Sequence, residues 1–312
     1  MQLHFDEAFE ILGKTIPFIL LRLLVYGVVL TGTLLWFGGI FLLFQSWPLP
    51  GPSWLAWVFG GVIFATVIKT LRNYVLYLLK AAHIAAITRI LLVGDLPTGM
   101  EQLRYGKDLV LQRFGQVSIL FLVDQLVNAV LKAFNRSIFS FIGFIPGVRL
   151  LRGFAQSVLD YSAGYVDEAI LSYSIVHPEL NPWRSARDGL ILYVQSWKTI
   201  LASGLVLALI SYALVAVVAA PGILLTYAAG GPIRGIGFAI SMALALFVKF
   251  ALMDPFALTS VIVTYHRAIE GQTVNEEWDR RLEALTGKFR QIKDNATAWD
   301  PPKPAPAPVR IP

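Results

Sequence analysis

Four long apolar segments constrain the fold of this chain more than any other feature. A helix needs about 20 mostly apolar residues to cross the hydrocarbon layer of a bilayer, because each residue adds only about 1.5 Å along its axis. The segments that satisfy this requirement are Pro17–Phe44, a segment that starts near Trp54 and reaches Lys69 and Arg72, Ile200–Ala220 and Gly235–Thr264. They predict four transmembrane helices in an all-α, polytopic integral membrane protein.

The composition excludes several other classes of protein. Of the 312 residues, 56% are hydrophobic and 15% are charged, whereas soluble domains carry about 25% charged residues. The chain has no cysteine, which excludes disulfide frameworks, thiolate metal sites and cysteine nucleophiles. Asp6, Glu7 and Glu10 stand where a signal peptide has basic residues, so the first span is expected to remain in the mature protein.

The distribution of lysine and arginine predicts the orientation in the membrane. The loop Gln45–Ser53 carries no charge and Pro221–Arg234 carries one basic residue, whereas basic residues are frequent on the other side of the predicted spans. Because cytoplasmic loops are enriched in lysine and arginine, we expect both termini in the cytoplasm. The net charge of +6 then marks the cytoplasmic face, and the expected location is a bacterial inner membrane.

The central region, residues 116–148, is apolar but interrupted. As helices, Val117–Leu131 and Ser137–Gly147 would extend only about 22 and 16 Å, which is less than the thickness of a bilayer core. We therefore expect a short or re-entrant hairpin with its tip at Lys132–Arg136, giving up to six spans if both arms cross the membrane.

The predicted organisation is a single helical membrane domain over residues 1–294. Two amphipathic helices, Tyr74–Val93 and Phe154–Val176, are expected on its cytoplasmic side. Comparing the chain with itself gives an internal repeat of residues 53–135 and 136–218 as a hypothesis, because chance accounts for part of the identities in so apolar a chain.

The C-terminal region predicts one more helix followed by a tail. Thr273–Lys293 has apolar residues at helical spacing, and Asn275 is suited to cap the start of this helix. Residues 295–312 are rich in proline and are expected to be disordered, with a docking peptide for a partner as the alternative.

Ionisable residues at membrane depth are the first candidates for function, because a charge there is costly and usually faces a partner or a wet cavity. Asp124, Lys249 and Asp254 fall within apolar segments, and Asp254-Pro255 predicts a kink. These three residues either line a path for an ion or a small polar solute or form an internal salt-bridge network that fixes the packing.

Charged residues outside the spans predict two further roles. Cytoplasmic ion pairs are expected among Asp167, Glu168, Arg104, Arg184 and Arg187. Contacts with anionic lipid headgroups are expected from Lys69, Arg72, Lys80 and Arg89. Nucleic acid is not an expected partner, because a soluble domain with stacking aromatic residues is missing.

No catalytic motif accompanies these charges. The sequence contains no phosphate-binding loop, dinucleotide fingerprint, H-E-x-x-H helix or G-x-S-x-G elbow. We therefore expect no catalytic residue, cofactor or metal.

The first expectation for function is a non-catalytic scaffold, oligomeric or accessory subunit of a membrane assembly. Its partners would be the bilayer with its anionic lipids, and further copies of the chain or other subunits of a membrane complex. The alternative is a transporter or channel for an ion or small polar solute that uses Asp124, Lys249 and Asp254. An enzyme that acts on lipids is the third possibility.

Short segments also resemble a known family. Ser185-Ala-Arg before a span, and the helix of Asp254 with its following acidic–basic segment, are similar to parts of choline transporter-like proteins. The likeness covers short pieces without a specific motif, so it implies no substrate and no residue role for this chain.

Overall fold

The described part of the protein is built from helices. The computed structural model describes residues 4–46, 54–71, 76–114, 117–142, 164–230 and 233–299, and no strand occurs among them. The elements are α1 (Phe5–Lys14), α2 (Ile16–Ser46), α3 (Trp54–Leu71), α4 (Tyr77–Val93), α5 (Glu101–Phe114), α6 (Val117–Ile142), α8 (Val166–Val176), α9 (Pro182–Ala229), α10 (Ile233–Val248), the π-helical turn η2 (Lys249–Met253), α11 (Asp254–Ile269), α12 (Glu276–Leu285) and α13 (Gly287–Thr297). The all-α prediction is confirmed for this part of the chain.

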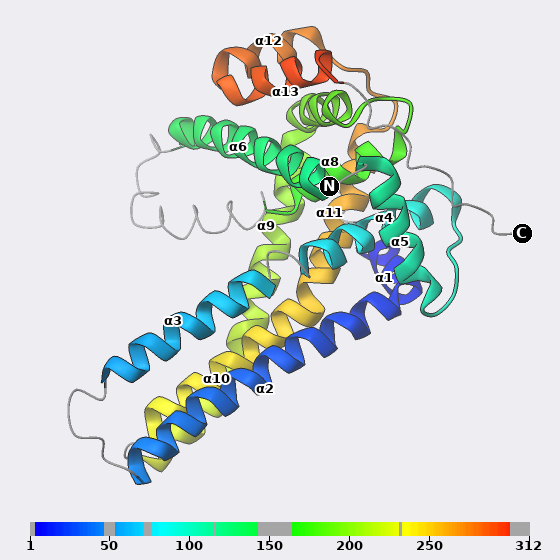
Figure 1. The fold of residues 1–312 in the computed structure, drawn as a ribbon. Coiled ribbons are helices and arrows are strands. Elements are labelled where there is room, and N and C mark those ends of the chain that lie inside the picture. The colour runs from blue at the N-terminus through cyan, green and yellow to red at the C-terminus, as the bar shows by residue number, and fades with distance from the viewer. Residues whose placement is uncertain are drawn as a thin grey trace, which may run out of the picture.

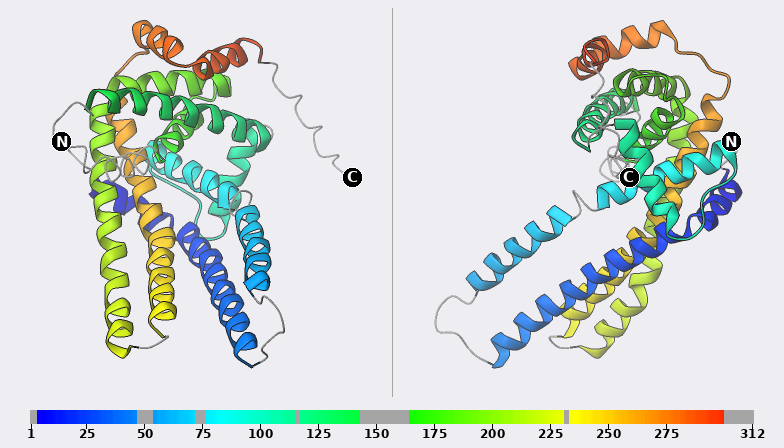
Figure 2. Two further views of the ribbon diagram at one scale, coloured as in Figure 1. Left: turned by 90° about the vertical axis from the view of Figure 1, so that its left-hand side faces the viewer. Right: turned by 45° about the vertical axis from the view of Figure 1, so that its right-hand side comes forward.

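The helices form two regions. The long helices α2, α3 and α10 and the second half of α9 extend together toward one end of the molecule (Figure 1). The remaining helices gather at the other end, where α1, α12 and α13 bring both ends of the described chain to the same side (Figure 2). We call the first group the span region and the second the layer.

Three helical stretches are long and apolar enough to cross a membrane. They are Ile16–Trp36 in α2, Pro182–Ala228 in α9, and Gly237–Ile269, which runs through α10, η2 and α11. These stretches indicate a membrane protein. The second predicted span, which starts near Trp54, corresponds to the helix α3, and its role as a span stays a prediction.

The third predicted span does not end at Pro221. Helix α9 continues through this residue to Ala229, because a proline removes a single N–H bond and apolar helices tolerate that loss. The next residue, Gly222, lets α10 approach closely, since a Cβ there would lie 2.2 Å from Ser241 Oγ.

The predicted central hairpin is wrong within the described residues. Helix α6 runs without a turn through Lys132–Arg136 and crosses the layer (Figures 1 and 2). The expected tip contains neither glycine nor proline, and apolar residues before and inside it keep helical spacing. Those buried on one stripe include Leu120, Val127, Val130 and Phe134.

The C-terminal helix begins where the sequence predicts but is divided. Asn275 caps α12, with its side-chain oxygen accepting a hydrogen bond from Glu277 N at 2.7 Å. Thr286 then ends α12 and caps α13, its hydroxyl accepting from Lys288 N. Helix α13 reaches Thr297, so the expected disordered tail does not start at residue 295; residues 300–312, the start of Phe154–Val176, and Arg72 lie outside the described residues.

Buried polar contacts hold the centre of the layer together. Ser172 on α8 lies 2.7 Å from the hydroxyl of Thr88 on α4 and 2.8 Å from His266 Nε2 on α11. The Tyr265 hydroxyl donates a hydrogen bond to the Gly189 carbonyl of α9. Because these groups are buried, their mutual hydrogen bonds fix how α4, α8, α9 and α11 pack.

Candidate functional site

A cavity of about 540 Å³ lies where the span region meets the layer. Helices α2, α4, α6, α11 and the π turn all contribute to its wall. The charged lining residues are Arg22, Lys80, Asp124 and Asp254. The other lining residues are aromatic or aliphatic: Tyr26, Val29, Leu76, Tyr77, Leu79, Phe121, Tyr165, Phe250 and Leu258. The cavity can therefore receive a group that is polar at one end and apolar at the other.

Asp254 and Lys249 form an ion pair at the edge of this cavity. Lys249 Nζ lies 2.8 Å from Asp254 Oδ1, and the same oxygen accepts a hydrogen bond from the Tyr165 hydroxyl at 2.9 Å. The kink expected at Pro255 takes the form of the π turn η2, which ends immediately before Asp254. A π turn adds a residue to a helical turn and occurs often at functional sites.

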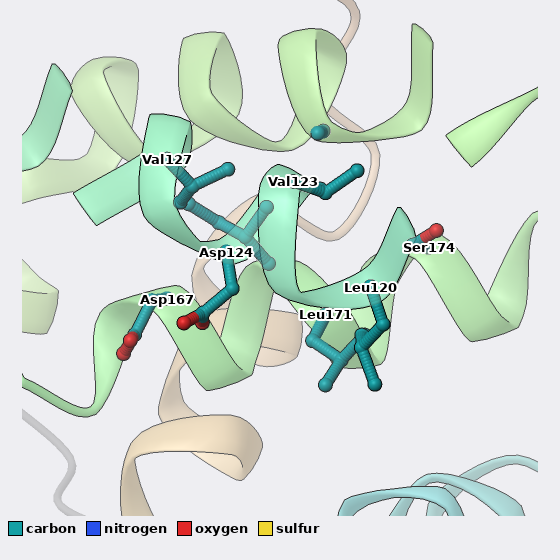
Figure 3. Close-up of a pocket in the computed structure, with 9 residues that line it drawn as sticks. Leu120, Val123, Asp124, Val127, Asp167, Leu171 and Ser174 are labelled. Carbon is teal, nitrogen blue, oxygen red and sulfur yellow. The ribbon is translucent and has the colours of Figure 1, made fainter. Parts of the chain in front are cut away.

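Asp124, which lines the cavity, lies beside a second acidic residue, Asp167 (Figure 3). Its side chain extends from α6 toward Asp167 on α8, and the two carboxyl groups are hydrogen-bonded. Asp167 also accepts hydrogen bonds from Asn128 Nδ2 at 2.7 Å and from Glu168 N at 3.0 Å. A hydrogen bond between two carboxyl groups requires a proton, and these additional donors favour the charged form of Asp167. Asp124 is therefore the member of the pair that carries the proton.

The electrostatics of the pair follow from its burial. Burial raises the pKa of Asp124 to about 7; the charge of Asp167 acts in the same direction, and Lys80 opposes it. Burial also raises the pKa of Asp167, against the effect of Lys80 and of its hydrogen-bond donors. The pair therefore holds a proton that exchanges near neutral pH.

Four basic residues were expected at lipid headgroups. Lys80 lines the cavity and forms an ion pair with Glu168. Arg89 lies over the ring of Tyr105 and donates hydrogen bonds to its hydroxyl and to the Asp95 carbonyl. Lys69 is exposed on α3, and Arg72 is outside the described residues.

The acidic residues of α8 do not pair with the expected arginines. Asp167 and Glu168 are buried against α6 and α4, because the acidic face of α8 points into the layer. Arg187 instead binds Asp279 of α12 at 2.7 Å and lies 3.2 Å from Asp188. Arg104 lies 3.8 Å from Asp108 on its own helix, and Arg184 is exposed.

The structure thus brings Asp124 and Asp254 to one cavity, with Lys249 bound to Asp254. Arg22 was not among the candidate residues predicted from the sequence, yet it is 7% exposed and lines the cavity. The sequence signal for Arg22 was that it is the one charged residue in the apolar segment Pro17–Phe44. Tyr165 carried no signal, because its contact with Asp254 joins residues that are distant in sequence.

The arrangement is suited to binding. Among the described residues, no group of three or more histidine, aspartate or glutamate side chains is placed to hold a metal ion. The cavity offers cations, a protonated carboxyl pair and aromatic walls, which together can hold a charged or amphipathic solute and exchange a proton.

Comparisons with known proteins add no relative to this picture. No family model, no characterised protein and no solved structure matches the chain.

Proposed function

We propose that this protein binds a small polar or amphipathic solute in the cavity between its span region and its layer, as part of transport across the membrane. The observation that carries the proposal is that charged residues from α2, α4, α6 and α11 surround one cavity of about 540 Å³. Because burying a charge is costly unless a partner or ligand compensates it, the convergence of these charges on a cavity favours a solute site over a packing role alone.

The proposed topology follows from the same arrangement. Helix α3 is the fourth span, and the layer, with both termini, faces the cytoplasm of a bacterial inner membrane. The clustering of lysine and arginine at the layer supports this orientation. Lys69, Arg104 and Arg184 are exposed and available to anionic lipid headgroups or to partners.

Cysteine labelling tests the transport proposal without knowledge of the solute, because the native chain has no cysteine. Val29→Cys and Leu76→Cys place single thiols in the cavity wall. The full-length variants are reconstituted into sealed vesicles, and a membrane-impermeant methanethiosulfonate is added on either side. A transporter is expected to expose at least one of these thiols to both sides.

Two control variants define the range of labelling. Ile262→Cys is fully buried and should remain unlabelled, whereas Leu285→Cys on α12 should react from one side only. Reaction of both cavity thiols from a single side, or no reaction, would contradict transport.

A scaffold or oligomeric subunit is the second candidate. A groove of about 340 Å³ on the layer supports it, because its lining is mostly apolar and includes Trp197, Trp278, Leu282 and Leu285. If this groove is an interface, the native protein in mild detergent should run as an oligomer or with a bound subunit. Leu285→Asp should then release the partner without changing helicity, and a monomeric wild type would contradict this role.

A further inference from the structure

Arg22 is a buried cation without an ion pair in the part of the chain that the structure describes. It lies in the first turns of α2 and is 7% exposed. Its Nε and Nη2 atoms are buried and have no hydrogen-bond partner among the described residues, although Arg22 lines the cavity. A buried charge without a partner is strongly unfavourable, so the structure leaves a specific need for an anion.

The described acidic residues around the cavity meet this need only in part, because Asp254 attracts Arg22 electrostatically but forms no ion pair with it. Asp254 is bound by Lys249 and by the Tyr165 hydroxyl. Asp124 shares a proton with Asp167, and Glu168 is paired with Lys80. Each of these described carboxyl groups is thus engaged with another side chain.

We propose that the cavity binds an oxyanion of the phosphate type, carried by a lipid headgroup or by a soluble phosphate compound, with Arg22 as its principal ligand. The guanidinium fork matches the oxygen spacing of a phosphate and makes two parallel charge-assisted hydrogen bonds. Lys80 adds a second cation to the same wall, and Tyr26 and Phe250 provide an apolar surface for the rest of the ligand. The inference rests on the proposed solute site and adds the chemical class of its occupant.

A thermal unfolding experiment tests the anion site. The full-length protein is purified in a phosphate-free, non-ionic detergent, and unfolding is followed by tryptophan fluorescence. One arm adds inorganic phosphate against sodium chloride of equal ionic strength; the other adds short-chain phosphatidic acid against the matching diacylglycerol. A saturable rise in the unfolding temperature is expected in at least one arm. A response to phosphate identifies a soluble source, and a response to phosphatidic acid alone identifies a lipid source.

Variants of Arg22 assign the response to this residue. In Arg22→Gln the apparent affinity for the active probe should fall about tenfold or more, whereas Arg104→Gln, an exposed arginine, should respond like the wild type. Without a probe, Arg22→Gln should be at least as stable as the wild type, because an uncompensated buried charge has been removed.

The opposite results would overturn the inference. These are the absence of a response in both arms, an unchanged response in Arg22→Gln, or a probe-free Arg22→Gln that is less stable than the wild type. Arg22→Lys keeps the charge without the fork, and this variant should also weaken the response. If the cavity cysteines are labelled from both sides but neither arm of the unfolding experiment gives a response, the anion site is overturned. The transport proposal is then unaffected.

Discussion

The span region and the layer use similar apolar residues for opposite purposes. In the stretch Ile16–Trp36 of α2 only 11% of the most apolar window is buried within the protein, whereas 61% is buried for Gly237–Ile269, which enters the layer. Helix α9 passes through both environments, since Leu190 is fully buried and Leu225 is 71% exposed. A lipid-facing surface needs only to be apolar, whereas a protein interior needs specific shapes and satisfied polar groups.

The largest expected effect comes from a comparison of leucine-to-alanine substitutions at the two ends of α9. Leu190→Ala should lower the free energy of unfolding by about 2–5 kcal/mol, because it leaves a cavity in the layer. Leu225→Ala should change it by less than about 0.5 kcal/mol, because lipid or detergent fills the space. Denaturant titration in mixed micelles measures both, and equal losses would contradict the division into two regions.

A glycine pair tests the same contrast at the backbone. A Cβ on Gly106 of α5 would lie 2.3 Å from the Ala82 carbonyl oxygen of α4, whereas one on Gly32 of α2 meets nothing within 4 Å. Gly106→Ala should therefore cost about 1–3 kcal/mol of stability through overpacking. Gly32→Ala should be neutral or stabilising by up to about 1 kcal/mol, since alanine favours the helix. The same denaturant titration compares them, and a neutral Gly106→Ala would show that α5 packs loosely.

The pH dependence of stability tests the protonated pair of the layer. In the folded protein the pKa of Asp124 is raised to about 7, whereas that of an unfolded aspartate is about 3.9. Folding therefore takes up a proton between these values. The contribution of protonated Asp124 to the free energy of unfolding is complete below about pH 4. As the pH rises, this contribution declines by up to about 1.4 kcal/mol per pH unit and is lost by about pH 7.

Asp124→Asn should flatten this decline, because the amide donates to Asp167 at any pH. Asp108→Asn, on the outer face of α5, should keep the wild-type profile. Apparent unfolding temperatures between pH 4.5 and 8 separate the variants. A wild-type profile in Asp124→Asn would mean that the pair does not hold the proton.

Sequence patterns predicted the features that depend on residues close together in the chain. Hydropathy and length identified the spans of α2 and α9 and the segment of α10 and α11. The side chain of Asn275 predicted where α12 begins. The sequence also indicated Asp124 and Asp254 as candidates, because carboxyl groups stand out in apolar segments.

The errors arose where packing overrides local signals. Pro221 reads as a helix end, yet α9 continues because α10 packs closely against it at Gly222. The polar residues Lys132, Asn135 and Arg136 suggested a turn, but Phe134 between them is buried against the aromatic rings of Tyr193 and Trp197 of α9. A helix whose polar residues face outward and whose apolar residues face a neighbour needs no turn.

By itself the sequence determined the helical character of the described residues and the three apolar stretches long enough to cross a membrane. Both features depend on the length and hydropathy of each segment alone. Only the tertiary structure decided which charges meet. The pairing of Asp124 with Asp167, the ion pair of Lys80 with Glu168, and the position of Arg22 at a cavity each join helices far apart in the chain. Such contacts depend on how helices cross, and the spacing of residues along one helix does not encode that geometry.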